Sequence, residues 1–289
     1  MKLIGKCAII TGGTRGLGYV IAKKYIENGA SVLICGREVE CLKKAEKKLK
    51  ELSGTDQIVI GLQKNVSIEE DIKELIEFAH KNMGKVDIVV NNAGVHGPKG
   101  LVENVDSEEW LEAIKTNLLS VFYMCKEIIP HMKERNSGKI INVSGGGATA
   151  PFPRVSAYAA SKAGIVRFTE TISEECKGYN IDINALAPGS LNTRLLDDIL
   201  ESGPQVVGAA FYEKALKQKE SGGISPELGA NLCVFLASDD SNGITGKLIS
   251  AVWDPWHDLA NYKDDLIDSD IYTLRRITEK DRGENWDQI

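Results

Sequence analysis

Two side chains spaced four residues apart in this chain can carry out acid–base chemistry: Tyr158 and Lys162. They fall in a stretch with helical composition, residues 157–177, and residues four apart on a helix share one face. A tyrosine phenol ordinarily has a pKa of about 10, which is too high for a general base near neutral pH. An ammonium about 4 Å away stabilises the phenolate by roughly the 4 kcal/mol that a three-unit shift requires. The pair therefore predicts proton exchange with a substrate oxygen, with Lys162 lowering the pKa of Tyr158.

A glycine-rich turn at residues 11–18, Thr-Gly-Gly-Thr-Arg-Gly-Leu-Gly, is typical of a phosphate-binding loop. It follows the apolar run 7–10 and leads into residues 19–26, whose apolar positions recur at helical spacing. Glycines let the backbone turn sharply and approach a pyrophosphate without a Cβ clash. The N-terminus of the following helix offers free N–H groups and the positive end of its dipole. Strand, turn and helix together predict half of a dinucleotide-binding βαβ unit.

Apolar runs and helical stretches alternate along residues 1–252, and this alternation must position those side chains. Strands are expected at residues 7–10, 31–35, 57–62, 86–90, 139–143, 181–186 and 247–252. Helices are expected at residues 19–26, 38–52, 68–82 with Ser67 as N-cap, 107–135 and 157–177. The pattern predicts an α/β fold, a single Rossmann-type, doubly wound parallel sheet with helices on both faces. Residues 1–252 are expected to form one domain, followed by a C-terminal extension at 253–289.

The composition limits the classes of partner. The 289 residues are 43% hydrophobic and 26% charged, which suits a protein with a sizeable core. The net charge of −6, without a concentration of Lys and Arg, argues against nucleic-acid binding. We recognise no secretory signal or spanning helix, which argues against a membrane partner. The six cysteines lack metal-ligand spacing, which favours a reduced, cytoplasmic protein without a metal site.

Four motifs occur together in the order and spacing of one protein family. They are the TGxxxGxG turn at residues 11–18, the run Asn91-Asn92-Ala93-Gly94, the pair Tyr158-xxx-Lys162, and Pro188-Gly189 followed by Thr193. On these residues the chain resembles the short-chain dehydrogenase/reductase family over about residues 3–252. The resemblance implies hydride transfer between a nicotinamide cofactor and a small-molecule substrate. It also implies a homodimer or homotetramer, packed through the helices that hold Asn117 and Tyr158.

The resemblance also assigns roles to single residues. The catalytic set would comprise Tyr158, Lys162, Ser144 and Asn117, the last shaping its helix and holding a water behind Lys162. The residues implied for cofactor binding are Gly12, Thr14, Arg15, Gly16, Leu17, Gly18, Arg37, Asn65, Val66, Asn91, Ala93, Gly94, Tyr158, Lys162, Pro188, Gly189 and Thr193.

The end of the second expected strand, Cys35-Gly36-Arg37, indicates which nicotinamide cofactor is bound. NAD sites usually have an acidic residue there for the ribose 2′-hydroxyl, and this run has none. The planar guanidinium of Arg37 suits a 2′-phosphate, and Arg15 matches a second basic position that the family associates with NADP. We therefore expect NADP(H). Asn65 replaces a common family aspartate, although its amide oxygen can still accept from adenine.

The chain departs from the family at the position of the catalytic serine, thirteen residues before the tyrosine. That position is Gly145, and loss of one donor to the reacting oxygen typically costs about 3–4 kcal/mol in the barrier. Three interpretations are open. Ser144 itself points into the site, or backbone N–H groups of residues 145–147 or a substrate hydroxyl donate instead, or the protein binds nucleotide without turnover.

Two segments bear on the substrate. Residues 194–224 correspond to the family's substrate lid, which the Gly203-Pro204 pair would split into two helical parts. The 253–289 extension combines aromatic residues with arginines, among them Arg275, Arg276 and Arg282. Such an arm could close over an active site, its own or that of a neighbouring subunit, with the arginines on a phosphate or carboxylate of a nucleotide-linked sugar. The alternative is a tail that is solvated or packs between subunits.

The sequence as a whole predicts an NADP(H)-dependent oxidoreductase that interconverts a secondary alcohol and a ketone. The arginines of the extension, and the lack of an evident apolar pocket, favour a polar or sugar-derived substrate. A 3-oxoacyl thioester reductase is the alternative among enzymes. A non-catalytic NADP(H)-binding regulatory subunit, suggested by Gly145, is the alternative from another class.

Overall fold

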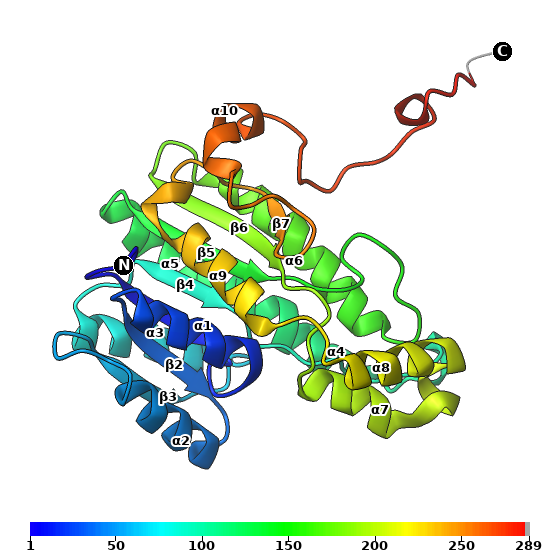
Figure 1. The fold of residues 1–289 in the computed structure, drawn as a ribbon, viewed down its shortest axis with the longest axis horizontal. Helices are drawn as coiled ribbons and strands as arrows, with labels where there is room; N and C mark the ends of the chain where they lie inside the picture. Colours follow the sequence, from blue (N-terminus) through cyan, green and yellow to red (C-terminus); the bar gives the residue numbers. More distant parts are fainter. Residues whose placement is uncertain (287–289) are drawn as a thin grey trace.

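A seven-stranded parallel sheet lies at the centre of the computed structural model, which describes residues 1–286 (Figure 1). The strand order is β3-β2-β1-β4-β5-β6-β7, so the predicted doubly wound α/β fold is confirmed. The strands are β1 (Cys7–Thr11), β2 (Ser31–Gly36), β3 (Val59–Gln63), β4 (Ile88–Asn91), β5 (Gly138–Val143), β6 (Ile181–Ala187) and β7 (Leu248–Ser250). The last three residues of the expected extension, 287–289, lie outside the described residues.

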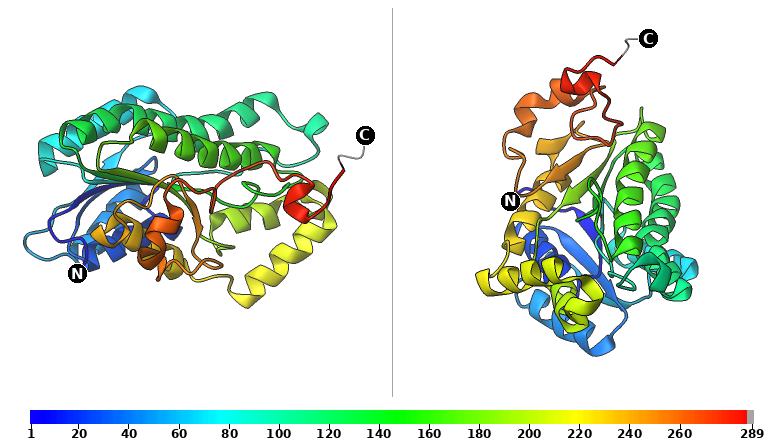
Figure 2. Two further views of the ribbon diagram at one scale, coloured as in Figure 1. Left: turned by 90° about the horizontal axis from the view of Figure 1, so that it is seen from above. Right: turned by 90° about the vertical axis from the view of Figure 1, so that its right-hand side faces the viewer.

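Helices cover both faces of the sheet (Figure 2). The α-helices are α1 (Gly16–Glu27), α2 (Val39–Lys50), α3 (Glu69–Met83), α4 (Ser107–Ile114), α5 (Ser120–Glu134), α6 (Ser156–Glu175), α7 (Arg194–Val207), α8 (Ala209–Ser221), α9 (Pro226–Ala237) and α10 (Lys263–Leu266). Shorter helical turns are η1 (Val102–Asn104), η2 (Lys115–Leu119), η3 (Asp239–Ser241), η4 (Leu259–Tyr262) and η5 (Lys280–Arg282).

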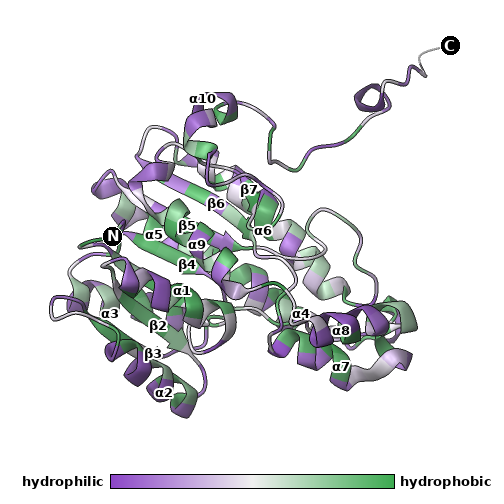
Figure 3. Ribbon diagram, in the orientation of Figure 1, coloured by the Kyte–Doolittle hydropathy of each residue, from purple (hydrophilic) through white to green (hydrophobic). Residues whose placement is uncertain are grey.

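Two apolar layers hold the helices to the sheet. Helices α1, α2 and α9 pack in one hydrophobic cluster and α3, α5 and α6 in the other. Strands β1, β4 and β5 are buried along their whole length, as expected for strands covered on both faces. Figure 3 accordingly shows apolar residues along the central strands and polar residues on the outer sides of helices such as α2. Within residues 1–286, no helix is both long and apolar enough to cross a membrane.

Local details correct two expectations and add a second break to the lid. Helix α3 begins at Glu69 with Ile68, not Ser67, as its N-cap, because the Ser67 amide and hydroxyl both donate to the Asn65 side chain. The helical region 107–135 is not one regular α-helix, since the π-helical turn η2 joins α4 to α5. The lid is kinked at Gly203 and divides into α7 and α8 at Gly208, both glycines having positive φ.

The first part of the extension packs against the domain. Trp256, Leu259 and Leu266 are buried in the same hydrophobic cluster as α1 and α9. Further on, the backbone amide of Leu248 in β7 donates to the carbonyl of Tyr272, which covers part of this edge of the sheet. The arm beyond this point runs away from the sheet and lies apart from α7 and α8 in Figure 1.

Candidate active site

A cavity of about 710 Å³ opens at the carboxyl ends of the central strands, where the strand order reverses between β1 and β4. Such a crevice is the usual ligand site of an open α/β sheet. Its walls come from the loops that follow each of the strands β1 to β6, and from the lid helices α7 and α8. The topology therefore brings together residues that lie far apart in the sequence.

The glycine turn has the backbone that a phosphate loop requires. Gly12 and Gly16 have φ values of 64° and 55°, a region that residues with a Cβ rarely adopt. A Cβ on Gly18 would overlap the carbonyl oxygen of Gly12, so this glycine allows α1 to pack against the loop. Helix α1 begins at Gly16 without a side-chain cap, which leaves its first N–H groups for an anion. The turn fits a nucleotide pyrophosphate.

The asparagine pair at the end of β4 is engaged with the rest of the sheet. Asn91 donates from its amide to Asn142 at 2.8 Å, while Asn92 donates to the carbonyl of Thr11 at 2.9 Å. The Thr11 hydroxyl accepts from the backbone amides of Asn92 and Ala93. These bonds join the loops after β1 and β4, and Ala93 and Gly94 line the cavity between them.

The charged groups after β2 form a cluster that includes a carboxylate. Arg15 and Arg37 both line the cavity, as expected for a 2′-phosphate site. Glu38, which sequence reasoning passed over, lines it too, and its carboxylate lies 3.5 Å from Arg15 and 3.8 Å from Arg194. A hydrogen bond from Cys41, together with the positive charges of Arg15, Arg194 and Arg37, lowers the pKa of Glu38. The sequence feature that could have revealed Glu38 is its position one residue after Arg37.

The two ends of the expected cofactor site also reach the cavity. Asn65 and Val66 line it beside β2, although the Asn65 side-chain oxygen already accepts from Ser67. At the opposite end, Pro188, Gly189 and Thr193 line the wall next to the lid. Thr14, Leu17 and Gly16 complete the wall near the glycine turn.

Tyr158 and Lys162 project from α6 into this cavity, and both are almost completely buried, with exposures of 8% and 4%. The Lys162 Nζ donates to the carbonyl of Val143 at 2.7 Å and lies 5.5 Å from the centre of the Tyr158 ring. Burial raises the pKa of Tyr158 to about 12 and lowers the pKa of Lys162 to about 8. The expectation that Lys162 lowers the pKa of Tyr158 is wrong for this arrangement, because desolvation of the phenol outweighs an ammonium held by Val143.

Asn117 lies in the π-helical turn η2 and is fully buried. Its side-chain oxygen accepts from the backbone N–H of Val95 and its nitrogen donates to the Val95 carbonyl, both at 2.8 Å. The nitrogen also donates to Ser161, one residue before Lys162. Asn117 thus ties the loop after β4 to the helix of the tyrosine and lysine.

The loop after β5 shows how the site accommodates Gly145. A Cβ at residue 145 would overlap the Tyr158 hydroxyl oxygen, so a serine does not fit beside the tyrosine in this arrangement. Ser144 is buried, and its hydroxyl lies 3.5 Å from the backbone carbonyl of Lys162. Ser144 and Gly145 both contribute to the cavity wall.

The lid supplies an apolar wall that the sequence did not reveal. Tyr158, Leu196 and Ile199 belong to one hydrophobic cluster, against which Phe152 and Phe211 pack. The signal was present in α7, whose apolar residues lie on one face, but the mixed composition of the lid obscured it. None of residues 253–286 lines this cavity, so the arginines of the extension do not reach the site of their own chain. Arg275 instead pairs with Asp270 and Asp281.

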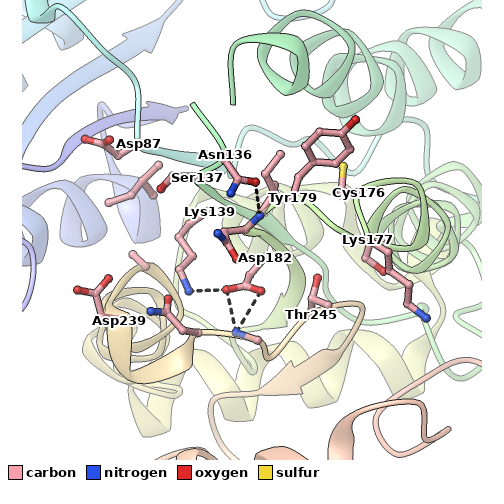
Figure 4. A pocket seen from close by; sticks show the side chains of 18 of the residues that line it. Asp87, Asn136, Ser137, Lys139, Cys176, Lys177, Tyr179, Asp182, Asp239 and Thr245 are labelled. Atoms are coloured by element: carbon pink, nitrogen blue, oxygen red, sulfur yellow. Dashed lines mark hydrogen bonds and ion pairs between the residues drawn. The ribbon is translucent and has the colours of Figure 1, made fainter. Parts of the chain in front are cut away.

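A second cavity, of about 680 Å³, lies at the opposite end of the sheet, near the amino ends of β5 and β6 (Figure 4). Its central ion pair joins Lys139 and Asp182 at 2.7 Å, and Asp182 also accepts from the backbone amide of Gly243. Lys139 further donates to Ser241. The charged and polar side chains of this cavity therefore bond to one another, whereas the polar side chains around Tyr158 have unused hydrogen-bonding capacity.

Comparison with known proteins agrees with this architecture. A family model described as short chain dehydrogenase matches residues 6–203. The chain belongs to the short-chain dehydrogenase/reductase family. It is therefore an oxidoreductase whose family uses a nicotinamide cofactor.

Relatives within the family have several activities. The chain is 34% identical over 251 residues to 3-oxoacyl-[acyl-carrier-protein] reductase FabG of Chlamydia muridarum, covering 86% of this chain and 96% of the relative. It is 35% identical over 249 residues to the NADP-dependent (R)-specific alcohol dehydrogenase of Lentilactobacillus kefiri, covering 85% and 94%. Among solved structures, an actinorhodin polyketide ketoreductase variant with NADPH matches with a TM-score of 0.77 at 27% identity, covering 85% and 95%. Levodione reductase matches with a TM-score of 0.79 at 25% identity, covering 86% and 96%.

Proposed function

We propose that this member of the family is an NADP(H)-dependent oxidoreductase that interconverts a ketone and a secondary alcohol. One observation carries the proposal: the Tyr158 hydroxyl and the Lys162 ammonium are buried in the same cavity that the glycine turn opens into. A proton donor and a nucleotide site that share one enclosed space are what a paired hydride and proton transfer requires.

Tyr158 and Lys162 have separate roles in this reaction. NADP(H), when bound, supplies the hydride to the carbonyl carbon or takes it from the alcohol. Tyr158 holds the proton: with a pKa of about 12 its phenol is neutral at pH 7 and suits donation to a ketone oxygen. Lys162, with a pKa of about 8, is mostly charged at pH 7, and the Val143 carbonyl holds its ammonium in the same cavity.

The cofactor assignment rests on Arg15 and Arg37 at the cavity wall, and on the NADP dependence of the Lentilactobacillus relative. Glu38 weighs against it, because a carboxylate repels a 2′-phosphate unless the arginines outweigh its charge. We expect Arg37→Ala to raise the KM for NADPH about 10- to 100-fold, as the loss of a charge-assisted hydrogen bond predicts, and to leave the KM for NADH unchanged. Initial rates with both cofactors test this, with Lys81→Ala on α3 as the control variant. Equal KM values for NADPH in Arg37→Ala and in the unmodified protein would overturn it.

The substrate proposal changes with the structure. Neither ground for a polar or sugar-derived substrate holds, since the arginines of the extension do not line the cavity and the lid provides an apolar wall. The wall formed by Leu196, Phe152 and Phe211 suits the apolar flank of a ketone. It also supports the second candidate, a 3-oxoacyl thioester reductase, which agrees with the activity of the Chlamydia relative.

A substrate panel tests the function. NADPH consumption is followed at 340 nm with cyclic ketones, 3-oxo esters, 3-oxoacyl thioesters and keto-sugars, and NADPH binding is measured separately by fluorescence. We expect consumption with an apolar ketone or 3-oxoacyl compound. Tight NADPH binding without consumption by any of them would favour the third candidate, a non-catalytic regulatory subunit. The same preparation gives the oligomeric state, which we propose to be a homodimer or homotetramer.

A further inference from the structure

His96 occupies the wall of the cavity directly beside the catalytic tyrosine. It follows β4 in the Asn-Asn-Ala-Gly-Val-His run and is 8% exposed. Its ring meets the Tyr158 ring edge-on, with centroids 4.9 Å apart and an interplanar angle of 73°. Its Nδ1 is buried and has no hydrogen-bond partner among residues 1–286.

An unpartnered ring nitrogen in this position needs an explanation. A buried polar atom without a partner typically costs about 1–3 kcal/mol, so such an atom usually bonds to an ordered water or a ligand. Burial, together with the positive charges of Lys99 and Lys162, lowers the pKa of His96 to about 4. The imidazole is therefore neutral at pH 7 and presents one N–H donor and one acceptor.

The loop that carries His96 is held in place from behind. Asn117 both accepts from and donates to the backbone of Val95, the preceding residue. On the following side, Gly97 has a φ of 71° and packs so closely on Ala113 that a Cβ would overlap it. The imidazole is thus positioned in advance, as a group that binds a reacting atom must be.

The chain lacks the serine that would donate to the reacting oxygen, and the Tyr158 hydroxyl fills the space beside Gly145 where its Cβ would lie. A side chain on another wall that contacts the tyrosine can supply a replacement donor. We propose that His96 is a catalytic residue whose neutral imidazole donates a hydrogen bond to the reacting oxygen of the substrate, in place of the missing serine. This role rests on the proposed function, and it adds a residue that neither the motifs nor the comparisons assign.

The kinetic test compares variants in the intact chain, with NADPH and the ketone of the panel that the unmodified protein reduces fastest. His96→Phe keeps the ring contact with Tyr158 and removes the donor, and we expect kcat to fall about 100- to 1000-fold, as for other lost oxyanion donors. The KM for NADPH should stay within twofold. His96→Gln restores a side-chain N–H, and we expect it to recover at least tenfold over His96→Phe. The matched control is His80→Phe on α3, a half-buried histidine whose Nε2 is buried and unpartnered outside the cavity, and its kcat should not change.

Nitrogen-15 NMR of the histidines gives a readout independent of turnover. The chain has four histidines, and the signal absent from His96→Phe identifies His96. With NADP⁺ and the same ketone, a complex that cannot react, we expect the His96 signal to shift and the His80 signal to stay.

The outcomes separate the two proposals. A chain that binds NADPH but reduces no member of the panel overturns the proposed function and this role with it. A chain that reduces the ketone while His96→Phe is equally fast, or is changed only in the KM for ketone, overturns the role of His96 alone.

Discussion

Two cavities of similar size lie at opposite ends of the same sheet, at about 710 and 680 Å³. At the amino ends of the strands, Lys139 and Asp182 satisfy each other and the backbone around them (Figure 4). At the carboxyl ends, Tyr158 and His96 are buried without a side-chain hydrogen bond to the described part of the chain. The two cavities are similar in volume, but they differ in whether their buried polar side chains have hydrogen-bond partners in the protein.

The difference separates a structural use of polar residues from a functional one. A buried ion pair with both partners in place is neutral in sum and needs no ligand. A buried phenol and a buried neutral imidazole that lack hydrogen-bond partners in the protein can bond to a molecule that enters the cavity. Removing groups from the two ends should therefore damage different properties of the protein.

The largest effect is expected at the carboxyl end. Tyr158→Phe removes one oxygen that carries the transferred proton, and we expect kcat to fall by 10³-fold or more, near the upper range for general acid–base catalysis. Thermal stability should change little, because the hydroxyl has no partner within residues 1–286. Stopped assays with NADPH and a reducible ketone, together with a melting curve, check both parts. A variant that keeps a tenth of the original kcat would remove the tyrosine from its proposed role.

The opposite result is expected at the amino end. Lys139→Met leaves Asp182 buried without its counter-ion, and we expect a loss of about 3–5 kcal/mol in the free energy of unfolding. The kcat per folded molecule should stay the same, because these residues do not reach the active-site cavity. Urea titration gives the stability change. Lys85→Met, which breaks the more exposed pair with Asp87, is the control and should cost less than about 1 kcal/mol.

The buried imidazole also predicts a dependence of stability on pH. The folded state lowers the pKa of His96 from 6.5 to about 4, so the unfolded chain binds a proton at higher pH than the folded chain does. Stability from this residue is therefore intact above pH 6.5 and decreases as pH falls towards 4, by up to about 3 kcal/mol. Urea titrations of the unmodified protein and of His96→Phe at pH 7, 5.5 and 4.5 isolate the contribution. Parallel losses in the two proteins would show that His96 is not held neutral by the fold.

The sequence predicted the parts of the molecule that depend on local pattern. Apolar runs and glycine positions reproduce the order of strands and helices, because buried parallel strands and a phosphate loop each require particular residue types at fixed spacing. The same kind of pattern predicted that Tyr158 and Lys162 lie together, since four-residue spacing on a helix places two side chains on one face.

What the sequence did not predict depends on contacts between distant segments. His96 is a single residue in a loop, and only the fold brings it against Tyr158. Its one available signal was its place just after the β4 strand, at the edge where such sheets bind ligands. The direction of the Tyr158 pKa shift depends on burial against the lid and on the bond that holds Lys162 at Val143. The path of the extension depends on the burial of Trp256 against helices far away in the sequence.

The smallest effect expected at the carboxyl end concerns Ser144, and it tests the first interpretation of Gly145 against the donor that we assign to His96. The Ser144 hydroxyl is buried and directed at the Lys162 carbonyl at 3.5 Å, near the limit for a hydrogen bond. Because this bond is weak and the hydroxyl is not the donor that we assign to the reacting oxygen, Ser144→Ala should change kcat by less than threefold. The comparison is with His96→Phe in the same assay. If Ser144→Ala instead lost 100-fold in kcat and His96→Phe did not, the serine rather than the imidazole would supply the missing donor, and the loop after β5 would have to rearrange when substrate binds.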